Sequence, residues 1–367
     1  MELDKAKKYV FDTRIFLENL KKDSSNSFFP SISNVTNHGS KLNLGFACYG
    51  LKLYKMTGKW FELSDVQQKE YIDFLLTFQT INSEFPKNYF IDAALVESYN
   101  DIFTIENFKF TLKKIISSVS NKKYVGKDTV LLQSINAENK QAISTLFELG
   151  YKKELKLENL HKETGSVTEY LQSLDWNKPW TSGAQFSSLC VYSKTQNFGY
   201  ENELMDFINS IIDNETGSFH TAGVTNSREV INGAMKVITG LDWIDQQIPF
   251  PKKLIDFCLN DIPILEGCDV VDFIYVLTKC SKQVDYRKEE IQGVLLELLD
   301  KIILLYHYEE KGFSYFQNKS QTHYYGTRIT KGKNVADIHG TVLCVWAINL
   351  ILDNFNMLDD GLHLIKP

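Results

Sequence analysis

The chain has 367 residues, a net charge of −6, 43% hydrophobic residues and 23% charged residues. These values are typical of a folded globular protein, and they exclude wholesale disorder, a collagen-like chain and a polar low-complexity chain. Because the net charge is negative, the chain as a whole lacks the excess of basic residues that is typical of nucleic-acid-binding proteins, so we expect no nucleic-acid partner. Proline is rare and aromatic residues reach 13%, which favours long helices around a large core.

We expect neither a secretory signal nor a transmembrane segment. Residues 1–16 carry charges throughout and lack the apolar stretch of a signal peptide. The most apolar run, residues 340–352, is shorter than the roughly 18 residues that span a bilayer, so we interpret it as a buried helix. The six cysteines form no CxxC pair, which favours a protein with free thiols in the cytoplasm.

The N-terminal part is predicted to be one helix and one loop. Residues 1–23 place apolar side chains at helical spacing, with lysines on the other faces. Residues 23–40 are rich in Ser, Asn, Gly and Pro and predict a long loop. No comparable linker follows, so we divide the chain into an N-terminal helix and loop at 1–40 and one domain at 41–367.

The rest of the chain is predicted to be helical, with two kinds of helix. Residues 203–213 and 291–306 repeat apolar side chains at i, i+3, i+4 and i+7, which gives one apolar face. Residues 42–54, 270–277 and 340–352 are apolar on nearly every side. A helix of the second kind must be covered on every side. We therefore predict outer amphipathic helices and enclosed inner helices.

A weak internal repeat links the two kinds of helix. An amphipathic helix runs into a turn with Phe, as in Gly217-Ser218-Phe219 and Gly312-Phe313, and a more apolar helix follows. Anchors near residues 85, 180, 219, 266 and 313 recur at about 40 to 50 residues if one weak unit separates the first two, a period typical of helical-hairpin repeats. An irregular all-α protein and an open solenoid remain alternatives.

This unit resembles the repeat of the α/α toroid, and the sequence is similar to terpenoid cyclases and protein prenyltransferase β-subunits. Two segments carry the resemblance, Glu266-Gly267-Cys268-Asp269 and Asp337-Ile338-His339-Gly340-Thr341. In the prenyltransferases an Asp and a Cys of the first segment and a His of the second hold one zinc ion. The resemblance thus implies an all-α toroid of inner and outer helices with zinc held by Glu266, Cys268 and His339.

Zinc chemistry suits these residue types without the resemblance. Thiolate, imidazole and carboxylate are usual zinc ligands, and three of them leave an open catalytic position. A helix start also lowers the pKa of a thiol, and Asp337 could orient His339. Alternatively, Cys268 is a small buried side chain and His339 is bonded to backbone. The sequence departs from the family, since no basic cluster precedes Glu266 and no D-x-D-D motif occurs.

A second cluster, residues 321–328, lies in a predicted loop of about twenty residues, and loops of that length are often functional. Tyr325 and His323 are candidates for a general base and acid. Arg328 is a candidate for binding a carboxylate or phosphate, because its guanidinium can fork such a group. We take these three as candidate catalytic residues. The alternative is a surface loop with an aromatic anchor.

Candidate substrate-binding residues lie near predicted inner-helix starts. Trp180, Trp243 and Tyr324 could contact a sugar or a prenyl chain, or pack between helices. Arg228 and Asn232 lie one helical turn apart. Arg228 is a candidate anion anchor, or else an exposed cap.

Three functions remain open. The first is a metal-assisted transferase or cyclase acting on a prenyl- or lipid-linked substrate in the toroid cavity. The second is a glycan-active (α/α) barrel enzyme of the lyase or hydrolase type, with a place in surface-polysaccharide metabolism. The third is a non-catalytic helical-repeat binding protein. The partner is accordingly a small molecule, a lipid-linked compound or a glycan.

Overall fold

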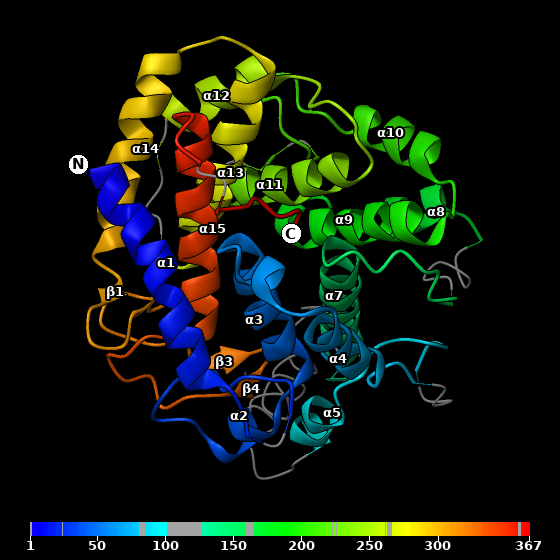
Figure 1. Cartoon of the computed structure of the whole chain (residues 1–367). Coiled ribbons are helices and arrows are strands. Elements are labelled where there is room, and N and C mark those ends of the chain that lie inside the picture. Colours follow the sequence, from blue (N-terminus) through cyan, green and yellow to red (C-terminus); the bar gives the residue numbers. More distant parts are fainter. Residues whose placement is uncertain are drawn as a thin grey trace, which may run out of the picture.

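The computed structural model describes residues 2–23, 25–80, 85–100, 127–158, 165–221, 223–224, 226–260, 262, 266–358 and 361–367. It is mostly helical (Figure 1), which confirms the all-α class. The strands among these residues are short and form two antiparallel hairpins. They are β1 (Tyr306–His307) with β2 (Gly312–Phe313), and β3 (His323–Tyr324) with β4 (Thr327–Arg328).

The longer helices fall into an enclosed set and a one-sided set. The enclosed set is α3 (Leu44–Met56), α7 (Lys127–Glu148), α9 (Pro179–Gln196), α11 (Ser227–Trp243), α13 (Cys268–Gln283) and α15 (Ile338–Asn354). The one-sided set is α1 (Glu2–Leu20), α4 (Asp65–Leu76), α8 (Val167–Ser173), α10 (Glu201–Ser210), α12 (Pro251–Asn260) and α14 (Lys288–Ile303). Short helices are α2 (Asn37–Lys41), η1 (Lys59–Glu62) and α5 (Ala93–Asn100).

The enclosed helices form a cycle of contacts. Each packs against the next in the order α3, α7, α9, α11, α13 and α15, and α15 packs back against α3. Helices α11 and α13 run parallel, since Arg228 meets Asp269 at their first turns while Lys279 meets Asp242 at their last turns. We call this cycle the helix ring, and its two sides the amino end and the carboxyl end.

Glycines bring α9 and α11 close together. A Cβ at Gly233 would lie 2.5 Å from Cβ of Pro179, and one at Gly183 would lie 3.0 Å from Cβ of Lys236. Larger side chains would hold these helices apart, since contacts this short cannot be accommodated. The close packing fixes the position of Lys236 within the ring.

A buried phenylalanine marks the turn after several outer helices. The turns predicted at Phe219 and Phe313 are present, and two similar turns occur at Phe28 and Phe90. Each Phe is fully buried and forms an antiparallel bridge to a residue near the end of its helix: Lys21 with Phe28, Gln79 with Phe90, Ile212 with Phe219 and Tyr306 with Phe313. Helices α1, α4, α10 and α14 therefore share one structural unit.

Residues 1–40 pack against the rest of the chain. α1 contacts α3, α14 and α15, and it lies beside α14 and α15 in Figure 1. The predicted loop contains α2, because the side chain of Thr36 accepts a hydrogen bond from the backbone of Gly39. Antiparallel bridges join Ser31 to Asp337 and Val35 to Thr330.

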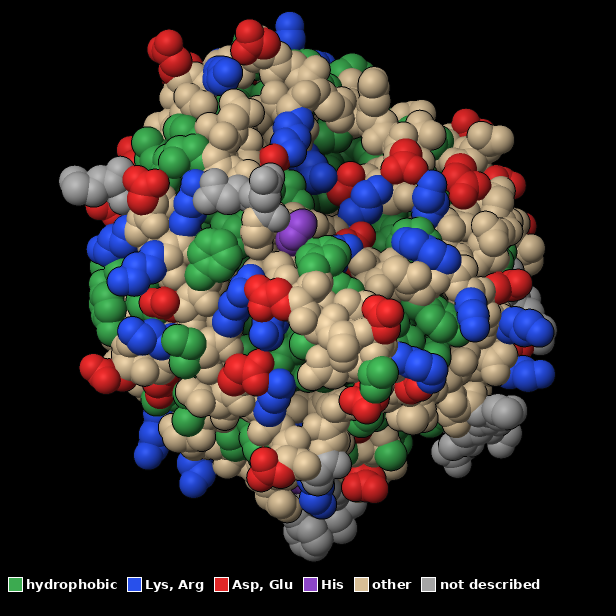
Figure 2. Space-filling model, viewed as in Figure 1, with side chains coloured by type: hydrophobic (Ala, Val, Ile, Leu, Met, Phe, Trp, Pro, Cys, Tyr) green, Lys and Arg blue, Asp and Glu red, His purple; other side chains and the backbone are tan. Residues whose placement is uncertain are grey.

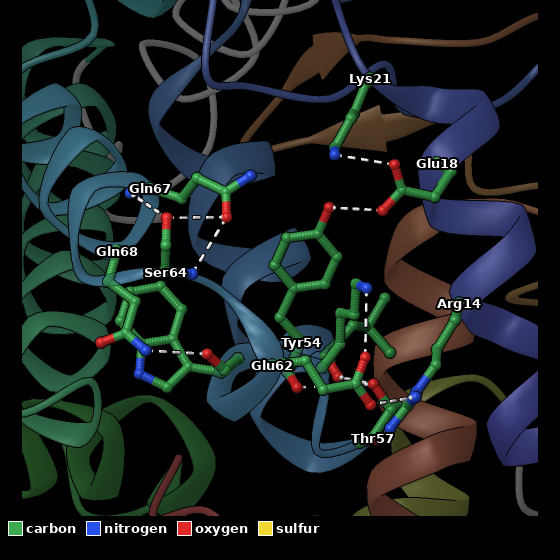
Figure 3. A network of polar contacts seen from close by, with 12 residues as sticks. Arg14, Glu18, Lys21, Tyr54, Thr57, Glu62, Ser64, Gln67 and Gln68 are labelled. Carbon is green, nitrogen blue, oxygen red and sulfur yellow. Dashed lines mark hydrogen bonds and ion pairs between the residues drawn. The ribbon is translucent and has the colours of Figure 1, made fainter.

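A polar network fastens α1 to α3 and the following turn (Figure 3). Arg14 donates to the carbonyl of Thr57 and pairs with Glu62 at 2.7 Å. The Tyr54 hydroxyl donates to Glu18 at 2.8 Å. These contacts tie the N-terminal helix to the carboxyl end of α3.

The C-terminal residues 361–367 cross the carboxyl end of the ring, and the C-terminus lies near α11 in Figure 1. Three hydrogen bonds hold this tail to three ring helices: the His363 amide to the Met56 carbonyl of α3, the Asn349 side chain of α15 to the His363 carbonyl, and the Trp243 indole of α11 to the Pro367 carbonyl. The tail therefore covers part of this end.

No helix among the described residues is long and apolar enough to cross a bilayer. The six cysteines, all within the described residues, form no disulfide.

Candidate functional site

Polar side chains connect the facing sides of α11 and α13. Arg228, Asn232 and Lys236 recur every four residues and so share one face of α11. Arg228 Nε and Asn232 Nδ2 each donate to a different oxygen of Asp269 at 2.7 Å. One turn further along, Lys236 Nζ lies 4.0 Å from Oδ1 of Asp272. A polar stripe therefore leads from the amino end into the ring.

Three of the predicted substrate-binding residues come together at this amino end. The Arg228 side chain is 52% exposed, and its guanidinium lies 5.8 Å from the ring centroid of Trp180. The Trp180 backbone amide donates to Glu229 on the first turn of α11. Asn232 is buried just below, on Asp269. Since Asp269 already pairs with Arg228, that arginine is not a free anion anchor.

Asp272 is a buried carboxyl group with an unsatisfied oxygen. Its Oδ2 is fully buried and has no hydrogen-bond partner. Burial raises the pKa of Asp272 to about 6, although the nearby Lys236 opposes this shift. A buried polar atom without a partner costs about 1–3 kcal/mol. Oδ2 of Asp272 therefore lacks a hydrogen-bond donor inside the ring.

Cys268, Tyr315 and His339 lie together where α13 and α15 begin. The Cys268 sulfur is 2.8 Å from the Tyr315 hydroxyl. The centroid of the Tyr315 ring lies 5.1 Å from that of His339, and the Tyr49 ring of α3 stacks on His339 at 4.7 Å. Burial lowers the pKa of His339 to about 3, with Lys236 and Lys52 adding to the effect. His339 is therefore neutral at physiological pH, and its buried Nδ1 has no partner.

Asp337 holds this cluster in place rather than contacting the His339 ring. Its carboxylate accepts backbone hydrogen bonds from Gly340, Tyr315 and Gln321 at 2.8–3.0 Å. The Gly340 bond caps the N-terminus of α15, and the other two fasten the 315–321 segment to that helix start. Burial nevertheless raises the pKa of Asp337 to about 6. Asp337 thus positions Tyr315 next to His339.

The predicted loop 321–328 splits into an inward and an outward face. Tyr324 is buried against Phe46 of α3, and its hydroxyl would lie 2.0 Å from a Cβ at Gly45, so that glycine makes room for it. Tyr325 is half-buried and stays next to Tyr324, with ring centroids 4.5 Å apart. Glu138 of α7 lies nearby, and burial raises its pKa well above the ordinary value while Tyr324 opposes the shift.

Lys52 of α3 and Lys140 of α7 also belong to the interior. Burial lowers the pKa of both, and for Lys140 the nearby charges of Lys236 and Lys52 add to the effect. Lys140, Lys236 and His339 are only half-buried, so they keep surface that water can reach although helices surround them. The polar interior, as we call it, consists of Lys52, Glu138, Lys140, Lys236, Asp272 and His339.

Other predicted site residues lie away from the polar interior. His323 and Arg328 are exposed and pair across β3 and β4, on the face opposite Tyr324. Glu266 is exposed in front of α13. Trp243 is fully buried at the carboxyl end, where its indole binds Pro367. The structure therefore separates Tyr325 from His323 and Arg328, and Trp243 from Trp180.

The described residues do not fit a three-ligand zinc site. Among them, no three His, Cys, Asp or Glu side chains gather to hold a metal ion. Burial raises the pKa of the Cys268 thiol to about 11, so it is protonated at neutral pH. The lysines that act on His339 also disfavour a divalent cation there. Zinc binding stays a prediction, and no chemical step below depends on it.

Sequence reasoning missed Lys52, Glu138, Lys140, Lys236 and Tyr315. A usable signal was present for Lys52, which stands in a helix that is otherwise apolar on every side. A charged residue at an enclosed position is costly and therefore informative. Glu138 and Lys140 lie in a more polar helix sequence that gives no comparable contrast.

The outer surface offers less specific features. On the face shown in Figure 2, basic and acidic side chains are interspersed and hydrophobic side chains lie in small groups. A surface cleft of about 590 Å³ lies beside Tyr315, with Glu266, Lys301, Leu305 and Lys319 among its lining residues.

Comparison of the chain with protein-family models, with curated proteins and with solved structures gave no match.

Proposed function

We propose that the helix ring is an α/α toroid and that its polar interior binds and transforms a hydroxyl-rich, anionic sugar compound. The cyclic contacts of the six enclosed helices and the outer helices around them support the toroid. Substrate enters from the amino end, where Arg228 and Trp180 lie. This is the glycan-active alternative among the functions considered from the sequence.

The set of unpartnered buried polar atoms carries the proposal. Oδ2 of Asp272 and Nδ1 of His339 are buried without a hydrogen-bond partner, whereas the Glu138 carboxyl group faces the Tyr324 hydroxyl. Native proteins leave few such atoms, and each one calls for a water or a ligand. A sugar hydroxyl can both donate and accept a hydrogen bond, so it can pair with buried donors as well as with buried acceptors.

The same groups can move protons. Burial raises the pKa of Glu138 well above the ordinary value, which favours its protonated form and suits a general acid. Asp272, with a pKa near 6, and the neutral His339 can accept a proton. Protonation of a leaving oxygen paired with proton removal elsewhere is the chemistry of glycoside hydrolysis or β-elimination.

The first function considered, a metal-assisted transferase or cyclase on a prenyl- or lipid-linked substrate, has less support. A prenyl chain would bury Asp272 and His339 against CH₂ groups, which raises the cost of their missing hydrogen bonds. The described residues also lack a three-ligand metal set. A non-catalytic binding protein would need no acid and base groups in its interior.

The test is turnover of oligosaccharides by the purified protein, followed by mass spectrometry of the products. The panel contains neutral, uronate-containing and phosphorylated oligosaccharides, and one prenyl diphosphate. We expect turnover of an anionic oligosaccharide, with a loss of about a hundredfold in Glu138→Gln, since general acid catalysis contributes about 10²–10⁴-fold. The control Glu203→Gln changes an exposed carboxylate of α10 and keeps full activity.

Turnover of the prenyl diphosphate alone would contradict the proposal and favour the transferase or cyclase. Binding without turnover of any compound would favour the non-catalytic protein. Equal activity of Glu138→Gln and wild type would remove Glu138 from the mechanism.

A further inference from the structure

We propose that the surface cleft beside Tyr315 binds a straight-chain fatty-acid carboxylate, with the alkyl chain on the floor of the cleft and the carboxylate at its rim. None of the six residues of the polar interior lines this cleft. The inference therefore goes beyond the proposed function and does not depend on it. The cleft volume of about 590 Å³ falls within the range of about 300–1,000 Å³ that is typical of small-molecule sites.

The floor of the cleft is apolar. Its lining residues include Val270 of α13, Ile302 of α14, Leu304 and Leu305 just after α14, and the aromatic pair Tyr315 and Phe316. The rings of that pair lie 4.5 Å apart, edge to face. Leu304 is 70% exposed. A large apolar side chain that lines a hollow gains free energy when an apolar ligand removes it from water.

The floor continues inward as a narrow apolar space between α13, α14 and α15. Val270, Ile302 and Leu305 line both the cleft and this space, whereas Leu343 and Cys344 of α15 line only the space. Its volume of about 10 Å³ holds about one water-sized group. A water there would lack the two to four polar partners that it needs, so the space suits the terminal CH₃ of an alkyl chain. A sugar ring would not fit.

A tight turn places a cation next to the apolar floor. Phe316 and Lys319 form an antiparallel bridge, in which the Phe316 amide donates to the Lys319 carbonyl at 3.1 Å. Asn318 within the turn has a φ of 61°, a left-handed conformation that asparagine tolerates. The Lys319 ammonium group lies 5.9 Å from the centroid of the Phe316 ring. The turn therefore holds this ammonium group at the rim.

The charges around the cleft favour an anion. Lys301, Lys319 and Glu266 are the charged side chains among its described lining residues. Both lysines are exposed, and neither forms an ion pair within the part of the chain that the structure describes. Two ammonium groups and one carboxylate leave one positive charge, which a ligand with a single carboxylate balances. An apolar floor with this rim matches an alkyl chain that ends in a carboxylate.

The experiment is isothermal titration calorimetry of the full chain with hexanoate, octanoate, octanol and octylammonium, each below its micelle concentration. We expect octanoate to bind saturably, octanol to bind several-fold more weakly, and octylammonium at least tenfold more weakly. Octanoate should bind about tenfold more tightly than hexanoate, since burial of each CH₂ group strengthens binding about fourfold.

Charge variants test the orientation of the ligand. Lys301→Gln and Lys319→Gln should each weaken octanoate binding about two- to fivefold, the range of an exposed ion pair. Glu266→Gln should strengthen it by a similar factor, because it removes like-charge repulsion. The matched control Lys69→Gln removes the same charge from α4, where Lys69 pairs with Asp73, and should bind octanoate like wild type. Loss of folding cannot produce opposite effects at the lysines and at Glu266.

Absence of saturable octanoate binding, equal binding of octanoate, octanol and octylammonium, or unchanged binding in both lysine variants would overturn the site. Weaker binding in Lys236→Gln with unchanged binding in Lys319→Gln would move the carboxylate to the polar interior and overturn the cleft. In a parallel sedimentation assay, binding to phosphatidylserine vesicles without binding of free octanoate would favour a membrane surface and overturn the fatty acid. Octanoate binding without turnover of any oligosaccharide would uphold this site and contradict the proposed function.

Discussion

Asp242 and Asp272 lie towards opposite ends of the helix ring and differ in how fully they are hydrogen-bonded. At the carboxyl end, Asp242 accepts hydrogen bonds from Tyr275 at 3.1 Å and Lys279 at 2.7 Å, and the Trp243 indole binds the C-terminal tail. In the half nearer the amino end, Asp272 and His339 each keep a buried polar atom without a partner. Asp242 on α11 therefore has hydrogen-bond partners that stabilise the fold, whereas Asp272 on the neighbouring helix α13 keeps an oxygen without a partner.

This contrast distinguishes groups that stabilise the fold from groups that bind a ligand. Groups that serve only the fold gain from hydrogen bonding, as Asp242 does at the carboxyl end. A group that binds a ligand lacks a hydrogen-bond partner in the free protein, and this missing bond lowers the stability of the free protein. We therefore expect substitutions at the carboxyl end to destabilise the protein, and some substitutions in the polar interior to stabilise it.

The largest effect is expected from Trp243→Ala. Loss of a fully buried tryptophan that also fastens the tail should lower the free energy of unfolding by about 3–5 kcal/mol. Urea unfolding monitored by circular dichroism measures this change. The half-exposed Trp180 provides the control, and Trp180→Ala should cost much less. Equal losses for the two variants would contradict the assignment of Trp243 to the fold.

The sequence predicted the fold better than the site, for a physical reason. Inner helices, outer helices and the turns at Phe219 and Phe313 follow from apolar periodicity, which repeats along the chain. The site depends on which charged side chains face inward across the ring, and sequence spacing within one helix does not determine that. Arg228 and Asn232 were found because they share a helix face, whereas Glu138 and Tyr315 come from distant segments.

A smaller effect, with the opposite sign, is expected from Asp272→Asn. The pKa of Asp272 is near 6 in the folded chain and about 3.9 in an unfolded one, so the folded state holds this proton more tightly. Its contribution to stability therefore falls as pH rises from about 4 to 6, by about 1–3 kcal/mol. Asn has no such proton, so the variant should be more stable than wild type at pH 7.

The readout is the difference in unfolding free energy between Asp272→Asn and wild type across pH 4 to 7. Taking the difference cancels His339, whose lowered pKa acts in the opposite direction, with stability lost as pH falls from 6.5 towards 3. A difference that does not grow with pH would contradict the raised pKa of Asp272.

The smallest effects are expected from His323→Ala and Arg328→Ala. Both side chains are exposed on the outward face of the β3–β4 hairpin, so stability should change by less than about 0.5 kcal/mol. Turnover of oligosaccharides should also stay at the wild-type level in both. Tyr325→Phe, on the inward side, should reduce turnover. A loss of turnover in Arg328→Ala alone would restore the catalytic role that the sequence predicts for that residue.

The central claim is that the polar interior, and not the outer surface, binds the substrate. A crystal structure of the protein grown with an anionic oligosaccharide tests it most directly. We predict sugar density beside Glu138, Asp272 and His339. Density only in the surface cleft lined by Lys301 and Lys319 would contradict the account.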